Sequence, residues 1–191
     1  DTNPLEQFNV WFQIAIDAEV NEANAMAIST ISEEGTPRSR YVLFKDIVDN
    51  KLVFYSDYES SKGREMENNP NISGLFFWPE LHRQIRLEGV VSKTSDEVSD
   101  NYFASRPRGA QLSAIASSQS TEIEGRETVE DRIKELEIEF EGKDIPRPDN
   151  WGGYAIDISF WEFWQGRRSR THDRFIYVKN DNSWEITRLS P

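Results

Sequence analysis

Cysteine is absent from this chain of 191 residues, which excludes disulfides, thiolate metal ligands and cysteine nucleophiles. Histidine is almost absent as well, because His82 and His172 are the only two, too few for a dedicated transition-metal site without thiolates. No apolar run approaches the roughly 20 residues that cross a bilayer, and no signal-peptide pattern occurs. We therefore expect no metal, no membrane partner and a reducing compartment, the cytoplasm, with His82 on the surface.

Basic residues are scarce relative to acidic ones. The chain has 22 Lys and Arg against 34 Asp and Glu, a formal net charge of -12, which disfavours general binding of nucleic acid or anionic lipid. The nucleotide motifs G-x-G-x-x-G and G-x-x-x-x-G-K-[ST] are also missing. Hydrophobic residues make up 37% of the chain, with 6 Trp, 6 Tyr and 11 Phe, so large apolar faces are available and residues 1–191 are expected to form a single domain.

The hydrophobic pattern predicts an N-terminal helix within residues 1–20, followed by strands. Asn3, Pro4 and Glu6 form a typical helix start, with a cap, a first-turn proline and a capping-box acid. Segments of period two, separated by short polar turns, then predict strands at 25–32, 40–44, 51–56, 72–78, 83–93, 154–158, 174–178 and 184–189.

Helices are predicted at 96–105 and at 126–141, the second one peripheral with an acidic, solvated face. Residues 145–153 are predicted to form a turn-rich connector. The pattern indicates a β-rich α+β chain built on an antiparallel sheet or barrel with flanking helices.

The cations are grouped despite the negative net charge. Several converging guanidinium groups match a small phosphate or carboxylate dianion, although a surface ion pair is the simpler interpretation for any single arginine. The groups are Arg38, Arg40 and Lys45; Lys62 and Arg64; Arg83 and Arg86; Arg106 and Arg108; and residues 167–174.

The segment "YESSKGRE" (58–65) combines serines with a lysine at a predicted helix start. Ser60 or Ser61 is placed to cap that helix, and its N-terminus with Lys62 suits an anion, while capping alone explains the serines equally well. Composition and spacing thus indicate a β-rich domain that binds a phosphorylated small molecule through arginines beside aromatics. They indicate no reaction.

Five segments carry a more specific signal when taken together: "RYVLFK", "FYSDYESSKGRE", "WPELHRQIRLEG", "YFASRPRGAQLSAIASSQS" and "WGGYAIDISFWEFWQGRRSRTHDR" with the terminal "RLSP". In this order and spacing they resemble the pyridoxine/pyridoxamine 5'-phosphate oxidase family, from the first helix to the last residue. The resemblance implies a split β-barrel homodimer with FMN at the subunit interface, contacted by both chains. It also implies oxidation of either vitamin phosphate to pyridoxal 5'-phosphate, with a hydride passing to the flavin and O2 reoxidising it to give H2O2.

The resemblance assigns residues by position to the cofactor and to the substrate. The FMN set is Arg40, Ser56, Ser61 and Lys62 at the phosphate and ribityl chain, Tyr41, Val42, Leu43, Lys45 and Tyr55 along the cofactor, and Gln84, Gln119, Ser120, Trp164 and Arg174 as further contacts. The substrate set is Lys45, Tyr102, Arg106 and Ala110 around the phosphate, with Arg170 and His172 at the reacting end.

Arg170 and His172 are also the predicted catalytic residues, with Arg167 and Arg168 left on the surface. His172 is a hypothetical proton carrier, because an unperturbed histidine titrates near neutrality.

Two positions depart from the family pattern. Ser61 stands where the family usually has an arginine beside the lysine, which predicts weaker FMN binding. Ala110 stands where the family usually has a serine that contacts the substrate phosphate, so one hydrogen bond of about 1 kcal/mol is missing.

Alternatives from other functional classes stay open. One is a flavin oxidase of the same superfamily that acts on another ring, as in the phenazine pathway. The presence of Ala110 mildly favours this alternative. Another is a non-catalytic split-barrel protein that stores or senses flavin, which would need no substrate anchors such as Lys45, Arg106 and Arg170. An RNA-binding barrel is disfavoured by the net charge.

Overall fold

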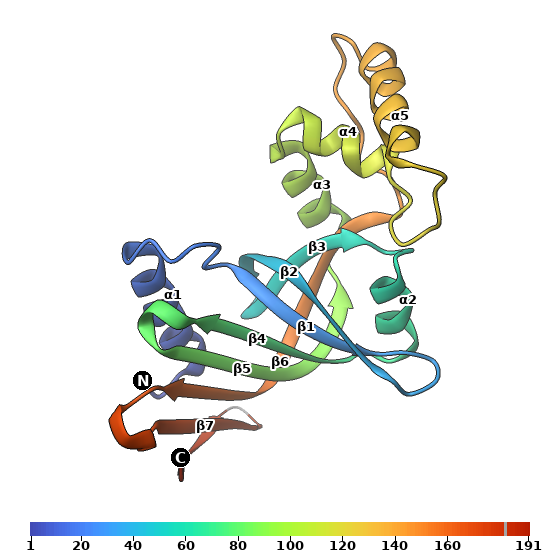
Figure 1. Ribbon diagram of the computed structural model, residues 1–191. Helices are drawn as coiled ribbons and strands as arrows, with labels where there is room; N and C mark the ends of the chain where they lie inside the picture. Colours follow the sequence, from blue (N-terminus) through green and yellow to red (C-terminus); the bar gives the residue numbers. More distant parts are fainter. Residues whose placement is uncertain (182) are drawn as a thin grey trace.

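The computed structural model describes residues 1–181 and 183–191 (Figure 1). The strands are β1 (Ala25–Ile31), β2 (Pro37–Val48), β3 (Lys51–Asp57), β4 (Asn71–Trp78), β5 (Arg83–Lys93), β6 (Trp151–Gln165), β7 (Asp173–Asn180) and β8 (Ser183–Leu189). The helices are α1 (Pro4–Asp17), α2 (Ser61–Asn68), α3 (Asp96–Ser105), α4 (Arg108–Ala116) and α5 (Arg126–Glu139), with 3₁₀ turns at Pro79–Leu81 and Arg168–Arg170. Within these described ranges, no helix has the length and hydrophobicity needed to cross a membrane.

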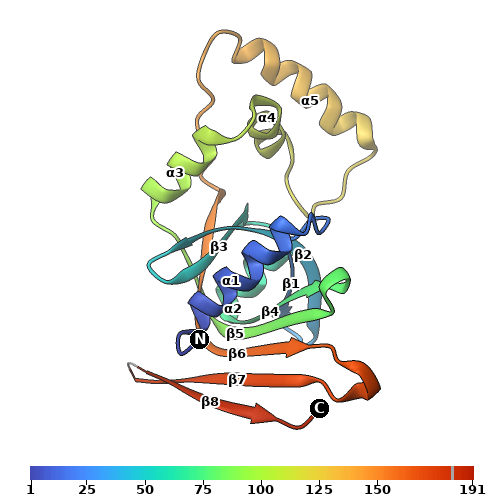
Figure 2. The same ribbon diagram turned by 90° about the vertical axis from the view of Figure 1, so that its left-hand side faces the viewer.

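The strands form one antiparallel sheet that closes on itself. Their order is β3-β2-β1-β4-β5-β6-β7-β8, and an additional pairing between β3 and β6 closes the first six strands into a barrel. Strands β7 and β8 continue the sheet beyond the point of closure (Figure 2). This arrangement confirms the prediction of a β-rich α+β fold with an antiparallel split barrel.

Helix α1 packs against the interior of the barrel with the apolar face that its sequence predicts. Phe8 is fully buried, and its ring centroid lies 5.3 Å from that of Phe44, 5.3 Å from that of Phe76 and 5.5 Å from that of Trp161. These partners come from β2, β4 and β6, so one helical residue joins three barrel strands in a single core. Burial of such large aromatic faces is the main favourable contribution to folding here.

The start of α1 agrees with the sequence prediction in its cap and differs in its capping box. The side chain of Asn3 accepts a hydrogen bond from the N–H of Leu5 at 2.9 Å. The capping-box prediction for Glu6 is wrong, because the N–H of Asn3 donates to Asp1 instead, at 3.3 Å.

Helices α3, α4 and α5 form a lobe beside the β3 and β6 end of the barrel (Figures 1 and 2). The lobe has a small core of its own, made of Phe103, Leu112, Leu136, Ile145 and Trp151. The remaining surface of α5 is exposed and largely acidic, as predicted. Since Trp151 is the first residue of β6, this second core fixes the lobe to the barrel.

One sequence prediction is wrong in this region, and one helix was missed. The connector predicted at 145–153 ends in strand, because Gly152 and Gly153 pair with Ser56 and Tyr55 of β3. Helix α4 was not predicted, since one of its faces borders a cavity and therefore carries small and polar residues instead of an apolar stripe.

Candidate functional site

A cavity of about 650 Å³ lies between β2, β3 and the helical lobe. Its lining includes the whole predicted phosphate set of the substrate, Lys45, Tyr102, Arg106 and Ala110. Lys45 comes from β2, Tyr102 and Arg106 from α3 and its C-cap, and Ala110 from α4. The fold therefore gathers residues that the sequence separates by more than sixty positions.

Lys45 reaches this cavity from a β-bulge in β2. The register between β2 and β3 shifts between Phe44 and Asp46, which leaves Lys45 unpaired in the ladder. Such bulges redirect a side chain and often occur beside active sites. Leu43, two residues earlier, also lines the cavity, whereas Phe44 between them and Val42 before them are buried in the barrel core. Only the backbone of Val42 is thus available to a ligand.

Arg106 is a half-buried cation that forms no ion pair with the residues the structure describes. Its Nη1 atom is buried and has no hydrogen-bond partner among the described residues, and its guanidinium lies 4.5 Å from the ring centroid of Trp151. Burial lowers the pKa of Arg106. An unpaired guanidinium at a cavity is costly to bury, so the site fits an anionic ligand that would complete its hydrogen bonds.

Aromatic rings form one wall of the cavity. The rings of Tyr55 and Tyr102 stack with centroids 3.7 Å apart and an interplanar angle of 10°. Burial, followed by the neighbouring Tyr102, raises the pKa of Tyr55 to about 12. Tyr55 is therefore a neutral hydroxyl at physiological pH, and the wall suits a flat ring.

A second cation, Lys62, lies at the start of α2. Its Nζ donates to Oε1 of Gln119 at 2.5 Å and to Oγ of Ser60 at 3.0 Å, and Ser56 donates to the same Gln119 oxygen at 3.2 Å. Burial, followed by the nearby charge of Arg40, lowers the pKa of Lys62 to about 8. A desolvated ammonium beside another cation favours a phosphate group, so these residues fit the phosphate end of a flavin nucleotide.

Arg40 is held by a carboxylate that sequence reasoning missed. Glu65 in α2 is 5% exposed, and it accepts from Arg40 Nη2 at 2.8 Å and from Arg38 Nη1 at 3.0 Å. Burial opposes ionisation, but the hydrogen bonds from Thr30, Arg40 and Arg38 lower the pKa of Glu65. Ser61 lies by a smaller hollow of about 200 Å³, next to Arg38 and Glu65.

Three predicted FMN residues lie side by side on neighbouring strands and form a row across the sheet, near the end of β6 that is remote from β3. Gln84 pairs with Trp164, which pairs with Arg174, on β5, β6 and β7. The Nε of Arg174 donates to Glu162 at 2.7 Å. Glu162 is 3% exposed and also accepts from Arg86 at 2.8 Å. The sequence does contain a signal for this pair of contacts, because Glu162 is a lone carboxylate in the aromatic stretch "FWEFW". A carboxylate buried among aromatic residues requires cationic or hydrogen-bonding partners.

The predicted catalytic residues lie in the turn between β6 and β7, next to this row. The His172 ring centroid is 4.7 Å from that of Trp164. Ser169 and Arg170 have φ angles of 56° and 61°, in the left-handed region that costs a non-glycine residue about 1 kcal/mol or more. Such strain persists only where neighbouring contacts fix the chain, and it concentrates at functional sites.

The two groups of predicted residues lie at opposite ends of β6. Ser56 and Tyr55 pair with Gly152 and Gly153 at its start, while Trp164 lies next to its end. With a rise of about 3.3 Å per residue, the separation measured along the strand is about 36 to 40 Å. One chain therefore does not bring both groups to the same small molecule.

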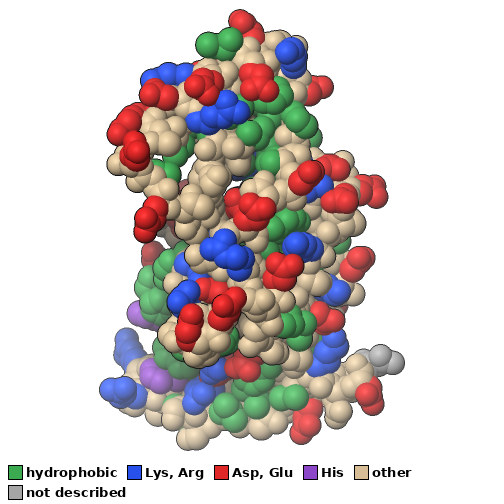
Figure 3. Space-filling model, turned by 90° about the vertical axis from the view of Figure 1, so that its right-hand side faces the viewer, with side chains coloured by type: hydrophobic (Ala, Val, Ile, Leu, Met, Phe, Trp, Pro, Cys, Tyr) green, Lys and Arg blue, Asp and Glu red, His purple; other side chains and the backbone are tan. Residues whose placement is uncertain are grey.

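The remaining predicted contacts are on the surface. Tyr41 is 75% exposed, and Gln119 and Ser120 are exposed in the turn that follows α4. His82, Arg167 and Arg168 are exposed, as predicted. Figure 3 shows acidic side chains over the helical end of the molecule, with Lys, Arg and His side chains gathered at one corner of the other end.

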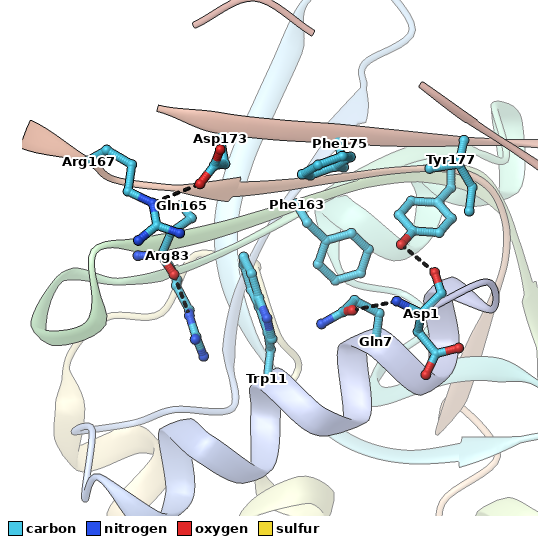
Figure 4. A pocket seen from close by; sticks show the side chains of 11 residues that line it. Asp1, Gln7, Trp11, Arg83, Phe163, Gln165, Arg167, Asp173, Phe175 and Tyr177 are labelled. Carbon is cyan, nitrogen blue, oxygen red and sulfur yellow. Dashed lines mark hydrogen bonds and ion pairs between the residues drawn. The ribbon is translucent and has the colours of Figure 1, made fainter. Parts of the chain in front are cut away.

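A separate hollow of about 450 Å³ lies between α1 and strands β6 and β7 (Figure 4). Its lining includes Trp11, Phe163 and Arg83, and none of the predicted site residues. Arg83 donates to Gln165 at 2.8 Å, and its guanidinium lies 4.4 Å from the ring centroid of Trp11. This hollow is on the α1 side of the sheet and is distinct from the cavity.

Comparisons with known proteins point to one family. A family model described as "Pyridoxamine 5'-phosphate oxidase" matches residues 12–139, and one described as "Pyridoxine 5'-phosphate oxidase C-terminal dimerisation region" matches residues 151–191. A pyridoxine/pyridoxamine 5'-phosphate oxidase of Cyanothece sp. (strain PCC 7425 / ATCC 29141) is 47% identical, over 100% of this chain and 90% of that protein. The protein of the same name from Burkholderia mallei (strain SAVP1) is 50% identical, over 99% and 89% of the two chains.

Solved structures give the same picture. PhzG from Burkholderia lata 383, in complex with tetrahydrophenazine-1-carboxylic acid, superposes with a TM-score of 0.95 at 30% identity, covering 100% of this chain and 94% of that one. A pyridoxamine 5'-phosphate oxidase-related, FMN binding protein from Nostoc punctiforme superposes with a TM-score of 0.79 at 16% identity, covering 99% and 98%. The second likeness concerns the fold alone.

Proposed function

The chain belongs to the pyridoxamine 5'-phosphate oxidase family, and from that premise we propose that it oxidises pyridoxine 5'-phosphate or pyridoxamine 5'-phosphate to pyridoxal 5'-phosphate, with O2 as the electron acceptor and H2O2 as a product. The observation that carries the proposal is the cavity lined by Lys45, Tyr102 and Arg106. The buried, unpaired Nη1 of Arg106 suits the phosphate, and the Tyr55 and Tyr102 wall suits the pyridine ring.

FMN is the cofactor, and it supplies the group that accepts a hydride from the substrate carbon. Lys62, Ser56 and Arg40 are the residues that would hold its phosphate end, with Gln119 beside them. Gln84, Trp164 and Arg174 would contact the cofactor from the row on β5, β6 and β7.

The chain's own residues then act mainly by positioning. Lys45, Tyr102 and Arg106 would anchor the substrate phosphate, and Arg170 with His172 would orient the reacting end. Anchoring a remote phosphate converts binding energy into alignment of the reacting carbon, which lowers the barrier without a further catalytic group.

The site would be completed by a second copy of the chain in a homodimer. The two groups of residues at opposite ends of β6 can meet at one FMN only if they come from different subunits. The match of residues 151–191 to a dimerisation region supports this arrangement. Exposed apolar side chains of the sheet support it too, since Phe77, which pairs with Gln84, is 56% exposed and Val90 is 49% exposed.

Subunit complementation tests the shared site. Lys62→Met should disable one end of the site and Arg174→Met the other, so each homodimer should lose FMN. Co-expressed subunits should form heterodimers with one intact and one doubly altered site, which restores about a quarter of wild-type activity for random pairing. No recovery, with both variants folded and dimeric, would show that each chain binds FMN alone.

A second candidate is oxidation of a reduced phenazine precursor. It is favoured by the superposition on PhzG bound to tetrahydrophenazine-1-carboxylic acid and by Ala110 in the cavity lining, since alanine offers no hydroxyl to a phosphate.

Anaerobic reduction of the bound flavin distinguishes these functions. The FMN-loaded protein is mixed without oxygen with pyridoxine 5'-phosphate, pyridoxamine 5'-phosphate or a dihydrophenazine carboxylate, and the yellow absorbance is followed. Prompt bleaching with formation of pyridoxal 5'-phosphate supports the vitamin oxidase. Arg106→Gln should slow it, whereas Arg126→Gln, at an exposed helix end, should not. A flavin that bleaches only with the phenazine substrate favours the second candidate.

A further inference from the structure

The turn between β6 and β7 determines which nitrogen of His172 carries the proton. The backbone N–H of Arg167 donates to Nδ1 of His172 at 3.1 Å. A ring nitrogen that accepts a hydrogen bond bears no proton, so the neutral ring carries its hydrogen on Nε2. The reversed ring orientation would place a carbon-bound hydrogen against the Arg167 N–H and leave that donor without its acceptor.

The turn is fixed on both sides of this hydrogen bond. Its two left-handed residues, Ser169 and Arg170, require such support, because an unsupported turn would relax to an unstrained backbone. The supporting contacts are Gly166 N–H to the His82 carbonyl at 2.7 Å, Arg167 Nε to Asp173 at 2.7 Å (Figure 4), and Thr171 Oγ1 to the Arg168 carbonyl at 2.9 Å.

We propose that His172 acts as a fixed Nε2–H hydrogen-bond donor to the reacting end of the substrate, and not as a base. The inference rests on the proposed function and deepens it. A base at this position needs a free lone pair directed at the substrate, and the only lone pair of the neutral ring is engaged by Arg167. The hydroxyl proton lost on oxidation of the alcohol substrate therefore passes to water.

The tautomer can be measured without turnover. Nitrogen-15 NMR of the FMN-loaded protein, labelled at histidine, should contain the signals of two side chains only. His82→Asn identifies which is which, because His82 is exposed and its φ of 50° is one that asparagine adopts readily. The neutral form of His172 should show hydrogen on Nε2. Hydrogen on Nδ1 would overturn the proposal.

Two amide variants separate a donor from a base. Gln at position 172 can present an N–H near the place of Nε2, whereas Asn reaches only the place of Nδ1, where its oxygen can accept from Arg167. A donor role predicts that His172→Gln keeps kcat within about tenfold of wild type, and that His172→Asn is slower by about a further tenfold, the effect of one hydrogen bond.

A base role predicts a different pattern. Both variants would then lose roughly 10²- to 10⁴-fold in kcat, and the pH dependence that His172 contributes would disappear from both. The charged residues nearest to His172 in this turn and at the start of β7, Arg167, Arg170, Asp173 and Arg174, are the same in wild type and variants, so a changed pH profile would report on His172 itself. That pattern, or equal and undiminished rates in the two variants, would overturn the proposal.

Failure of the proposed function gives a distinct result. If the wild-type protein binds FMN but oxidises neither vitamin phosphate, the vitamin oxidase assignment fails, and the donor role toward this substrate falls with it. The NMR measurement would still decide the tautomer, because it needs no substrate.

Discussion

FMN binding should weaken above pH 8 because of Lys62. In the protein without cofactor, burial and then the neighbouring Arg40 lower the pKa of Lys62 to about 8. A bound phosphate dianion favours the ammonium and would raise that pKa again. Binding at higher pH therefore requires the uptake of a proton, and the dissociation constant should increase by the factor 1 + 10^(pH − 8). From pH 7 to pH 9 the increase is about tenfold, or about 1.4 kcal/mol.

The same pKa shift has the opposite effect on the stability of the cofactor-free protein. An unfolded lysine keeps its proton up to a pH of about 10.4, whereas folded Lys62 loses it near pH 8. The cost of burying the charge is fully present below pH 8 and is relieved as the pH rises toward 10. This contribution to the free energy of unfolding should therefore grow over the range in which FMN binding weakens.

The assay is a titration of FMN fluorescence quenching at pH 7, 8 and 9. Lys62→Arg is the control, because arginine stays charged throughout this range, so its affinity should hardly change with pH. Proton loss from the flavin itself would affect both proteins alike. Equal slopes for wild type and Lys62→Arg, or an affinity of the wild type that does not change, would refute the reasoning.

Three further changes test other parts of the structure. Ala110→Ser should restore a hydroxyl at the cavity and lower KM for the vitamin phosphates about fivefold, the effect of about 1 kcal/mol, in steady-state assays; an unchanged KM would contradict this. Glu162→Gln should leave two guanidinium groups without their buried counter-charge, cost about 3 kcal/mol of stability in thermal or urea unfolding and weaken FMN binding, whereas the half-exposed Glu88→Gln should do neither. Gly63→Ala should lower both the Tm and the FMN affinity, because a Cβ would overlap the carbonyl of Tyr58 and displace the start of α2; a variant that keeps both would show that the helix can shift freely.

Strands whose residues alternate in burial could be predicted from the sequence, and so could β3, although most of its residues are buried. The start of β6 could not. β1 alternates between buried and half-buried residues along its length, which is the period that the pattern detects. The first six residues of β6, Trp151–Ile156, are all buried, because this stretch pairs with β3 and Trp151 also packs in the core of the lobe. Without alternation, and with two glycines, residues 151–153 resemble a connector, whereas residues 154–156 fall within the strand predicted at 154–158.

Only part of the candidate site could be predicted from the sequence. Residues such as Lys62 and Arg174 were found through a resemblance, by position. Glu65, the partner of Arg40, and Glu162, the partner of Arg174, were missed because these pairs depend on contacts between distant segments. Glu65 in particular lies in a helix with acidic neighbours, and no local pattern separates a buried carboxylate that holds Arg40 from a solvated one. Whether Glu65 is buried depends on its contact with Arg40 in the folded chain. That contact forms because the barrel closes and α2 packs against it.

The length of β6 connects the fold to the proposed function. A closed barrel with a sheet extension requires one strand that pairs with β3 at its start and with β7 at its end, and β6 does both. The same strand therefore carries Gly152 near the cavity and Trp164 in the row with Gln84 and Arg174. These two positions are too far apart for one chain to contact a single FMN with both. In a two-fold dimer, the start of one β6 region can lie near the end of the other, and every such contact occurs twice. Two complete sites would then form together, so a chain prevented from dimerising should lose FMN affinity even with every site residue intact.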